Sequence, residues 1–179
     1  MKTLSYLFGT LLIISFSGCT TMSESECATA DWHDIGIKDG RNGTPASYME
    51  KRRQDCTKDG FSLDQKQYMA GRNTGILQYC TSENGRSEGL LGRPYLNSCP
   101  ANLEHDFLIN YEAGKLVYSA KRNVDDLNRQ SEHVQHKLDK EKEDVKRQDL
   151  RKELQALDHQ LNRARTKLTD EERRLRELD

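Results

Sequence analysis

Tyr68-Met-Ala-Gly71-Arg-Asn-Thr-Gly75-Ile-Leu-Gln-Tyr79-Cys80 is the stretch that decides the fold. Aromatic and apolar residues recur in it at steps of three and four, which predicts a helix from about Asp64 to Ser82. Two glycines, four residues apart, lie on the aromatic face of that helix. A glycine inside a helix costs about 1 kcal/mol relative to alanine, so this pair indicates a place where another backbone comes close.

A shorter helix is predicted ahead of this stretch, over residues 31–40, with Trp32 as its core residue. It carries Gly36 and Gly40, again four residues apart. We therefore expect the glycine faces of the two helices to pack directly against each other.

Two capping signals lie between these helices. Thr44-Pro45 is a favourable pair for the N-cap and first position of a helix, which we expect to run to about Lys58. Ser62-Leu-Asp-Gln65 fits a capping box for the glycine-bearing helix that follows.

Residues 1–18 have the three parts of a bacterial export signal. Lys2 gives a positive start, Leu4–Phe16 is an uncharged apolar run, and Ser17-Gly18 provides the small residues that precede a cleavage site. The apolar run is too short to span a bilayer as a helix. These features predict a signal peptide over 1–18.

Phe16-Ser-Gly-Cys19 resembles the lipobox of bacterial lipoproteins, which implies that Cys19 is the lipid-attachment residue and carries acyl chains such as palmitate. Secretion with an unmodified Cys19 is the alternative. Thr20 follows where an inner-membrane lipoprotein has aspartate, so the resemblance implies an anchor in the outer membrane, on its periplasmic side. The polar residues up to Glu26 suggest that 19–26 is a lipidated tether.

Four other cysteines remain on this exported chain: Cys27, Cys56, Cys80 and Cys99. An even number in an oxidising compartment predicts two disulfides, and three pairings are possible. We favour Cys27 with Cys56 and Cys80 with Cys99, because each closes a short loop worth about 3 kcal/mol in the chain-entropy model. A zinc site is the alternative, but the spacings match no standard finger.

A family resemblance follows from a set of spaced residues: Trp32, Ile35-Gly-Ile-Lys-Asp-Gly40, Gly43, Arg53, Cys56, Tyr68, Gly71, Gly75, Tyr79-Cys80, Gly85, Gly89, Gly92, Tyr95 and Cys99. They resemble a bacterial lipoprotein family known as domain of unknown function 2799. The resemblance covers about residues 27–118. It implies a small, cysteine-stapled envelope domain and carries no activity to this chain.

The segment Asn84–Tyr95 is rich in glycine, but its spacing lacks the motif of a phosphate-binding loop. We predict a compact loop here, held by two cysteines, and a possible binding surface on it made of Arg86, Arg93, Tyr95 and Asn97. No residue set in the chain predicts a catalytic site, a metal site or a cofactor.

Residues 119–179 differ from everything before them. From residue 120 onward they hold 16 Lys or Arg and 15 Asp or Glu. Two runs of small or apolar residues follow heptad spacing: Val117, Ala120, Val124, Leu127, Ser131, Val134, Leu138 and Val145, then Leu150, Leu154, Leu157, Leu161, Ala164, Leu168, Leu175 and Leu178. The tail is therefore predicted to be a long charged helix or a coiled coil.

The two heptad runs are out of phase by two residues, which a single uninterrupted seam does not allow. Either one helix continues and its seam rotates, or the chain reverses between Val145 and Leu150. Residues 141–150 contain mostly strong helix formers and no Gly, Pro, Asn or Ser. We favour the continuous helix, about 110 Å long over some 75 residues, whose seam would need a partner.

The sequence thus predicts a mainly α protein with a small disulfide-stapled helical domain, residues 27–118, and the tail. The formal net charge of −1 gives no reason to expect nucleic acid as a partner. The expected role is structural or protein-interacting, in an envelope protein held to the membrane by its N-terminal lipid, with a protein partner or self-association through the coiled coil. A small envelope enzyme or ligand-binding domain, with its site in the Gly-rich region, is the alternative.

Overall fold

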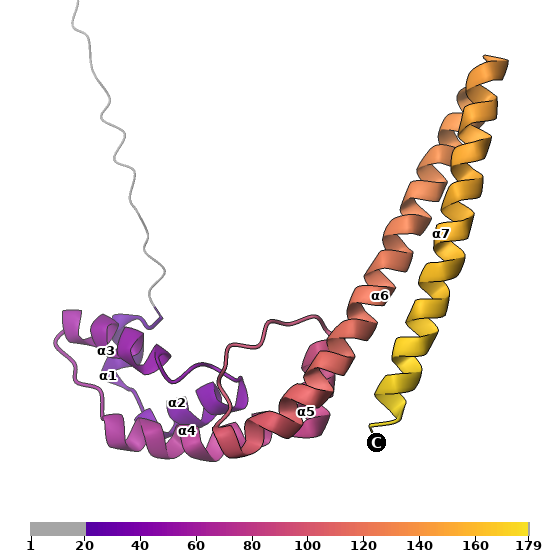
Figure 1. The fold of residues 1–179 in the computed structure, drawn as a ribbon. Helices are drawn as coiled ribbons and strands as arrows, with labels where there is room; N and C mark the ends of the chain where they lie inside the picture. Colours follow the sequence, from indigo (N-terminus) through magenta and orange to yellow (C-terminus); the bar gives the residue numbers. More distant parts are fainter. Residues whose placement is uncertain (1–20, 179) are drawn as a thin grey trace, which may run out of the picture.

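The computed structural model describes residues 21–178, so the predicted signal peptide and Cys19 lie outside the described residues. The described chain is helical and contains no strand (Figure 1). Its helices are α1 (Glu24–Ala28), α2 (Trp32–Arg41), α3 (Tyr48–Lys58), α4 (Gln65–Tyr79), α5 (Ser82–Leu90), α6 (Ala101–Lys140) and α7 (Asp144–Arg176). The prediction of a mainly α fold is confirmed.

Helices α2 and α4 pack glycine on glycine, as the sequence predicted. A Cβ added to Gly40 would lie 2.5 Å from the carbonyl oxygen of Arg72, and one added to Gly75 would lie 3.0 Å from the amide nitrogen of Arg41. Both neighbouring atoms are backbone, so the helices are in direct main-chain contact. Gly43 follows α2 with a φ of +64°, and its Cα faces the ring of Tyr79.

The segment 84–95, predicted as a loop, is mostly helix, and that prediction was wrong. Helix α5 occupies residues 82–90, and Gly85 and Gly89 face the backbone of α6 at Phe107 and Tyr111. A Cβ on Gly89 would lie 2.9 Å from the amide nitrogen of Lys115. The glycines were interpreted as loop formers, whereas they serve to bring two helices together.

The α5–α6 pair repeats the α2–α4 pair. Gly36-x3-Gly40-x2-Gly43 and Gly85-x3-Gly89-x2-Gly92 have the same spacing, and the last glycine of each has a positive φ beneath a tyrosine ring. The helices that these glycines contact, α4 and α6, also correspond. Tyr68, Gly75 and Tyr79 of α4 make the same contacts, in the same order, as Phe107, Gly114 and Tyr118 of α6. The domain therefore consists of two similar helix-pair halves.

Two helix starts differ from their predicted positions. Helix α3 begins at Tyr48, after a turn in which the amide of Tyr48 donates to the carbonyl of Pro45 at 2.9 Å. Helix α4 is capped by Asp64, whose carboxylate accepts from the amide of Gln67, and not by Ser62. An aspartate one residue before the helix gives the same N-cap bond directly.

The two disulfides are those predicted, Cys27–Cys56 and Cys80–Cys99, with Cα–Cα distances of 5.4 and 5.6 Å. In each half, the bond joins the segment before the first helix of the pair to the segment before the second. Trp32 and Tyr68 lie in the core beside the first disulfide, and Phe107 and Tyr111 lie beside the second.

The tail is a hairpin, and the favoured continuous helix was wrong. Helix α6 ends at Lys140, three residues turn the chain, and α7 returns along α6 (Figure 1). The two helices bury a shared seam: Leu127, Val134, Leu157, Leu161 and Ala164. Because the chain covers its own seam, the length of the tail no longer requires a partner. None of the helices between Thr21 and Leu178 is long and apolar enough to cross a membrane.

Candidate functional site

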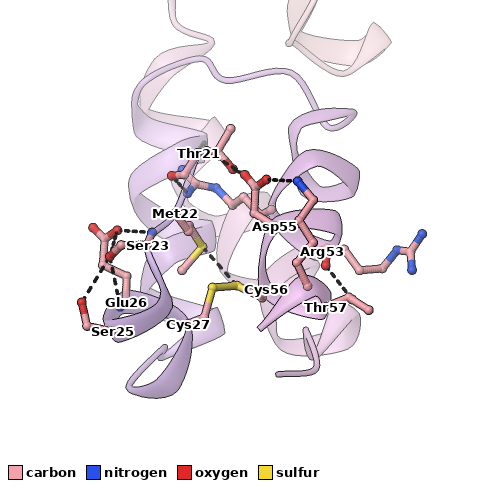
Figure 2. The surroundings of a disulfide bond; sticks show 12 residues. Thr21, Met22, Ser23, Ser25, Glu26, Cys27, Arg53, Asp55, Cys56 and Thr57 are labelled. Atoms are coloured by element: carbon pink, nitrogen blue, oxygen red, sulfur yellow. Dashed lines mark hydrogen bonds and ion pairs between the residues drawn. A yellow bond between two sulfur atoms is a disulfide. The ribbon is translucent and has the colours of Figure 1, made fainter. Parts of the chain in front are cut away.

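The residues that follow the predicted lipidation site are bound to the domain. The amide and the hydroxyl of Thr21 both donate to Oδ2 of Asp55 on α3, each at 2.7 Å, and Nη1 of Arg52 donates to the carbonyl of Thr21 at 3.3 Å. Figure 2 shows Thr21 and Asp55 facing each other. A segment held by three hydrogen bonds has a fixed position on the domain.

Met22 is 5% exposed and packs beside the first disulfide, with its sulfur 3.9 Å from Sγ of Cys56 (Figure 2). Helix α1 follows at once, started by a capping box in which Ser23 and Glu26 bond reciprocally. The predicted tether over 19–26 is therefore corrected for the described residues, since Thr21 and Met22 contact α3 and residues 23–26 cap and begin α1. Polar composition suggested a tether because it does not reveal that Met22 reaches the core.

The contacts of Thr21 change the acidity of its partner. Two hydrogen bonds from Thr21 to the charged carboxylate lower the pKa of Asp55 to about 2, and Lys58 adds a smaller effect in the same direction. Asp55 is therefore ionised at neutral pH and well into the acidic range. The group that holds the N-terminal segment on α3 is therefore a charged carboxylate.

An ion pair between half-buried Arg52 and buried Asp39 also holds this region. Arg52 donates from Nε and Nη2 to the two oxygens of Asp39, at 2.8 and 2.7 Å, and the hydroxyl of Tyr68 donates to Asp39 at 2.8 Å. Burial, and then the bond to Asp39, raises the pKa of Tyr68 well above its usual range. Because Arg52 also reaches Thr21, this cluster connects the N-terminal segment to α2 and α4.

Arg72 is a buried cation that joins the two halves of the domain. Its Nη2 donates to the carbonyls of Thr44 and Ser98, both at 3.1 Å. Within residues 21–178, Nε of Arg72 and Oγ of Ser98 have no hydrogen-bond partner. Sequence reasoning missed this role, because Thr44 and Ser98 lie in loops of different halves.

The four residues predicted as a binding surface have different surroundings. Arg86 donates to the carbonyl of Leu175 at 2.7 Å and holds the end of α7. The hydroxyl of Tyr95 donates to Glu104 and accepts from the amide of Cys99.

Of the other two, Arg93 is exposed and paired with Glu88, and Asn97 is exposed with a φ of +52°. Arg86 and Tyr95 are thus largely occupied in internal contacts, which leaves Arg93 and Asn97 as the outward-facing members of the set.

The histidines of the tail, His133, His136 and His159, are exposed. The described chain contains no group of three His, Cys, Asp or Glu side chains placed to hold a metal ion. An open hollow of about 500 Å³ lies at the turn of the hairpin. Its lining is His136, Lys137, Lys140, Glu141, Lys146, Asp149, Leu150 and Glu153.

Comparison with known proteins gives one match. Residues 31–116 match the family model described as "Protein of unknown function (DUF2799)". No curated protein and no solved structure matches the chain. The matched range contains both glycine-packed helix pairs and ends before the hairpin separates from the domain.

Proposed function

Since residues 31–116 place the chain in the DUF2799 family, whose function is unknown, we propose from its own features that it is an envelope lipoprotein with an interaction role. The protein is anchored by lipid on Cys19 to the periplasmic side of the outer membrane. The α6–α7 hairpin is the arm through which it contacts a protein partner. The sequence of residues 1–19 is the basis for the anchor.

The hairpin is the observation that carries the interaction role. It is made of helices of 40 and 33 residues and extends well beyond the domain (Figure 1). The domain is fixed to the hairpin at its base, because α6 belongs to both and Arg86 of α5 bonds the end of α7. A stiff arm with a covered seam keeps its outer, charged face available for contacts.

The hairpin offers a partner a different surface from the exposed seam that the sequence predicted. With the seam buried within one chain, self-association through heptad positions is no longer needed. A partner instead meets the charged outer face or the turn, where Val145 is 66% exposed. Charged surfaces of this kind favour specific and salt-dependent contacts over obligate ones.

Both disulfides support the proposed compartment, because such bonds form and persist in oxidising environments such as the periplasm. The alternative, a ligand site in the Gly-rich region, has less support than the interaction role. Gly85 and Gly89 lie against the backbone of α6 and do not line a loop that would cradle a ligand.

The anchor is tested by Cys19→Ser, which should move the protein from the membrane pellet to the soluble periplasmic fraction. Recovery of the variant in the pellet would refute lipid anchoring. The arm is tested by photo-crosslinking residues placed singly along the hairpin in cells. Adducts of one mass, from adjacent positions on one face, are expected, and uniformly weak crosslinking along the hairpin would refute the interaction role.

A further inference from the structure

We propose that α3 lies directly on the bilayer surface in the lipidated protein, with its basic stripe at the level of the lipid phosphates. We define this stripe as Tyr48, Lys51, Asp55 and Lys58. The inference rests on the proposed lipidation of Cys19 and goes beyond it, since a lipid anchor alone does not determine which face of a domain meets the membrane.

The length of the connection is the first argument. Only Thr20 separates the lipid-bearing Cys19 from Thr21, so the Cα atoms of Cys19 and Thr21 are at most about 7 Å apart. Thr21 is bound to Asp55 by two hydrogen bonds of 2.7 Å. The Cα of Cys19 therefore lies within about 15 Å of the middle of α3, which leaves the domain little slack to turn another face to the membrane.

The chemistry of the stripe is the second argument. Residues at 48, 51, 55 and 58 follow one another at steps of three and four, so they share one side of α3. Nζ of Lys51 lies 4.8 Å from the ring centre of Tyr48, and the side chain of Lys58 is 69% exposed.

The only acid in the stripe, Asp55, already accepts bonds from Thr21 and Lys58. Lysines extend their charge to phosphates while their stems lie over apolar surface, and tyrosine prefers the interfacial layer.

The opposite side of the domain provides the comparison position. In Figure 1, α2 lies between α3 and α4, so the outer face of α4 points away from α3. Asn73 is exposed on α4, and Gln54 is exposed on α3 beside the stripe. If the bilayer lies against α3, a probe at position 54 is close to the lipid headgroups and a probe at position 73 remains in water.

The test uses the full lipidated protein, purified from membranes and placed in vesicles of phosphatidylcholine and phosphatidylglycerol that carry a headgroup-attached quencher. A fluorescent amino acid replaces Gln54 in one sample and Asn73 in another. We expect quenching at position 54 to exceed that at 73 several-fold. Equal quenching at the two positions, with the protein bound to the vesicles, would overturn the proposal and leave the lipid anchor intact.

Two variants test whether the short connection from Cys19 to Thr21 and the stripe are what hold α3 at the membrane. A ten-residue Gly-Ser insertion between Thr20 and Thr21 should reduce quenching at position 54 to the level at 73 while the protein stays bound. The double variant Lys51→Glu, Lys58→Glu should lower it several-fold with unchanged far-UV circular dichroism. If both leave it unchanged, neither the short connection nor the stripe holds α3 at the membrane, and that part of the proposal is overturned. A protein that fails to bind vesicles at all refutes the proposed lipidation instead.

Discussion

Replacing Gly75 by alanine sets two physical effects against each other. Alanine is better than glycine in a helix by about 1 kcal/mol, so propensity alone predicts a more stable α4. The structure opposes this, because the added Cβ would lie 3.0 Å from both the amide nitrogen of Arg41 and the carbonyl carbon of Ile37, and closer still to the carbonyl oxygen of Ile37. These are backbone atoms of α2, which cannot rotate away.

The magnitude follows from the nature of those neighbours. Overpacking costs about 1–3 kcal/mol, and the upper end applies where two helix backbones must separate. Subtracting the gain in propensity leaves a net loss of about 2 kcal/mol. For a chain of this size, 1 kcal/mol shifts the Tm by about 2–4 °C, so Gly75→Ala should lower the Tm by about 4–8 °C.

The assay is thermal unfolding at 222 nm, with both disulfides intact. Asn73→Ala, on the exposed side of the same helix, is the matched control and should leave the Tm unchanged or slightly raised. Gly71→Leu should prevent the domain from folding. If Gly75→Ala raises the Tm as the control does, helix propensity decides the position and the close packing of α2 and α4 contributes nothing to stability.

The remaining predictions concern separate parts of the molecule. Alkylation of the unreduced mature protein should label none of the four domain cysteines, and labelling of two or more would reject the stapled domain. The stability that the bond from Thr21 to Asp55 contributes is fully present above the ordinary carboxyl pKa near 3.8 and is lost as the pH falls through about 2. The bond itself needs the ionised carboxylate, so the Thr21 amide resonance should titrate near 2, and a midpoint near 4 would contradict this. Spin labels at positions 121 and 172 should lie within about 30 Å in the hairpin, whereas a single rod would separate them by about 75 Å. Arg86→Ala should speed amide exchange in the last turns of α7, and unchanged exchange would show that its bond to Leu175 does not hold that end.

The helices of the first half could be predicted because their signals are local. The periodic pattern around Tyr68 and the spacing of Gly71 and Gly75 describe one helix face. The backbone of α2 lies so close to that face that these two positions must be glycine. The cysteine pairing was predictable for a similar reason, since each bond closes a short loop.

Helix α5 was missed although its signal is present. Gly85, Gly89 and Gly92 repeat the spacing of Gly36, Gly40 and Gly43. Interpreted singly, three glycines within eight residues suggest a loop. Compared with the earlier triplet, they indicate a second helix packed on a backbone, and the structure bears this out with α6.

The sequence by itself determined the helical class, the glycine faces and the charged tail with its out-of-phase heptads, because the periodicities behind them join residues three, four or seven positions apart. For the cysteines it only favoured one of three pairings, which the structure then showed. Tertiary structure alone decided that the tail folds back and that the N-terminal segment is docked. Residues 141–143 contain no helix breaker. The chain reverses there because pairing α6 with α7 buries Leu127, Leu157 and their neighbours, and Arg147 bonds the freed carbonyls of Leu138 and Glu141. Such contacts join residues far apart in sequence, and their free energy outweighs the local preference for helix.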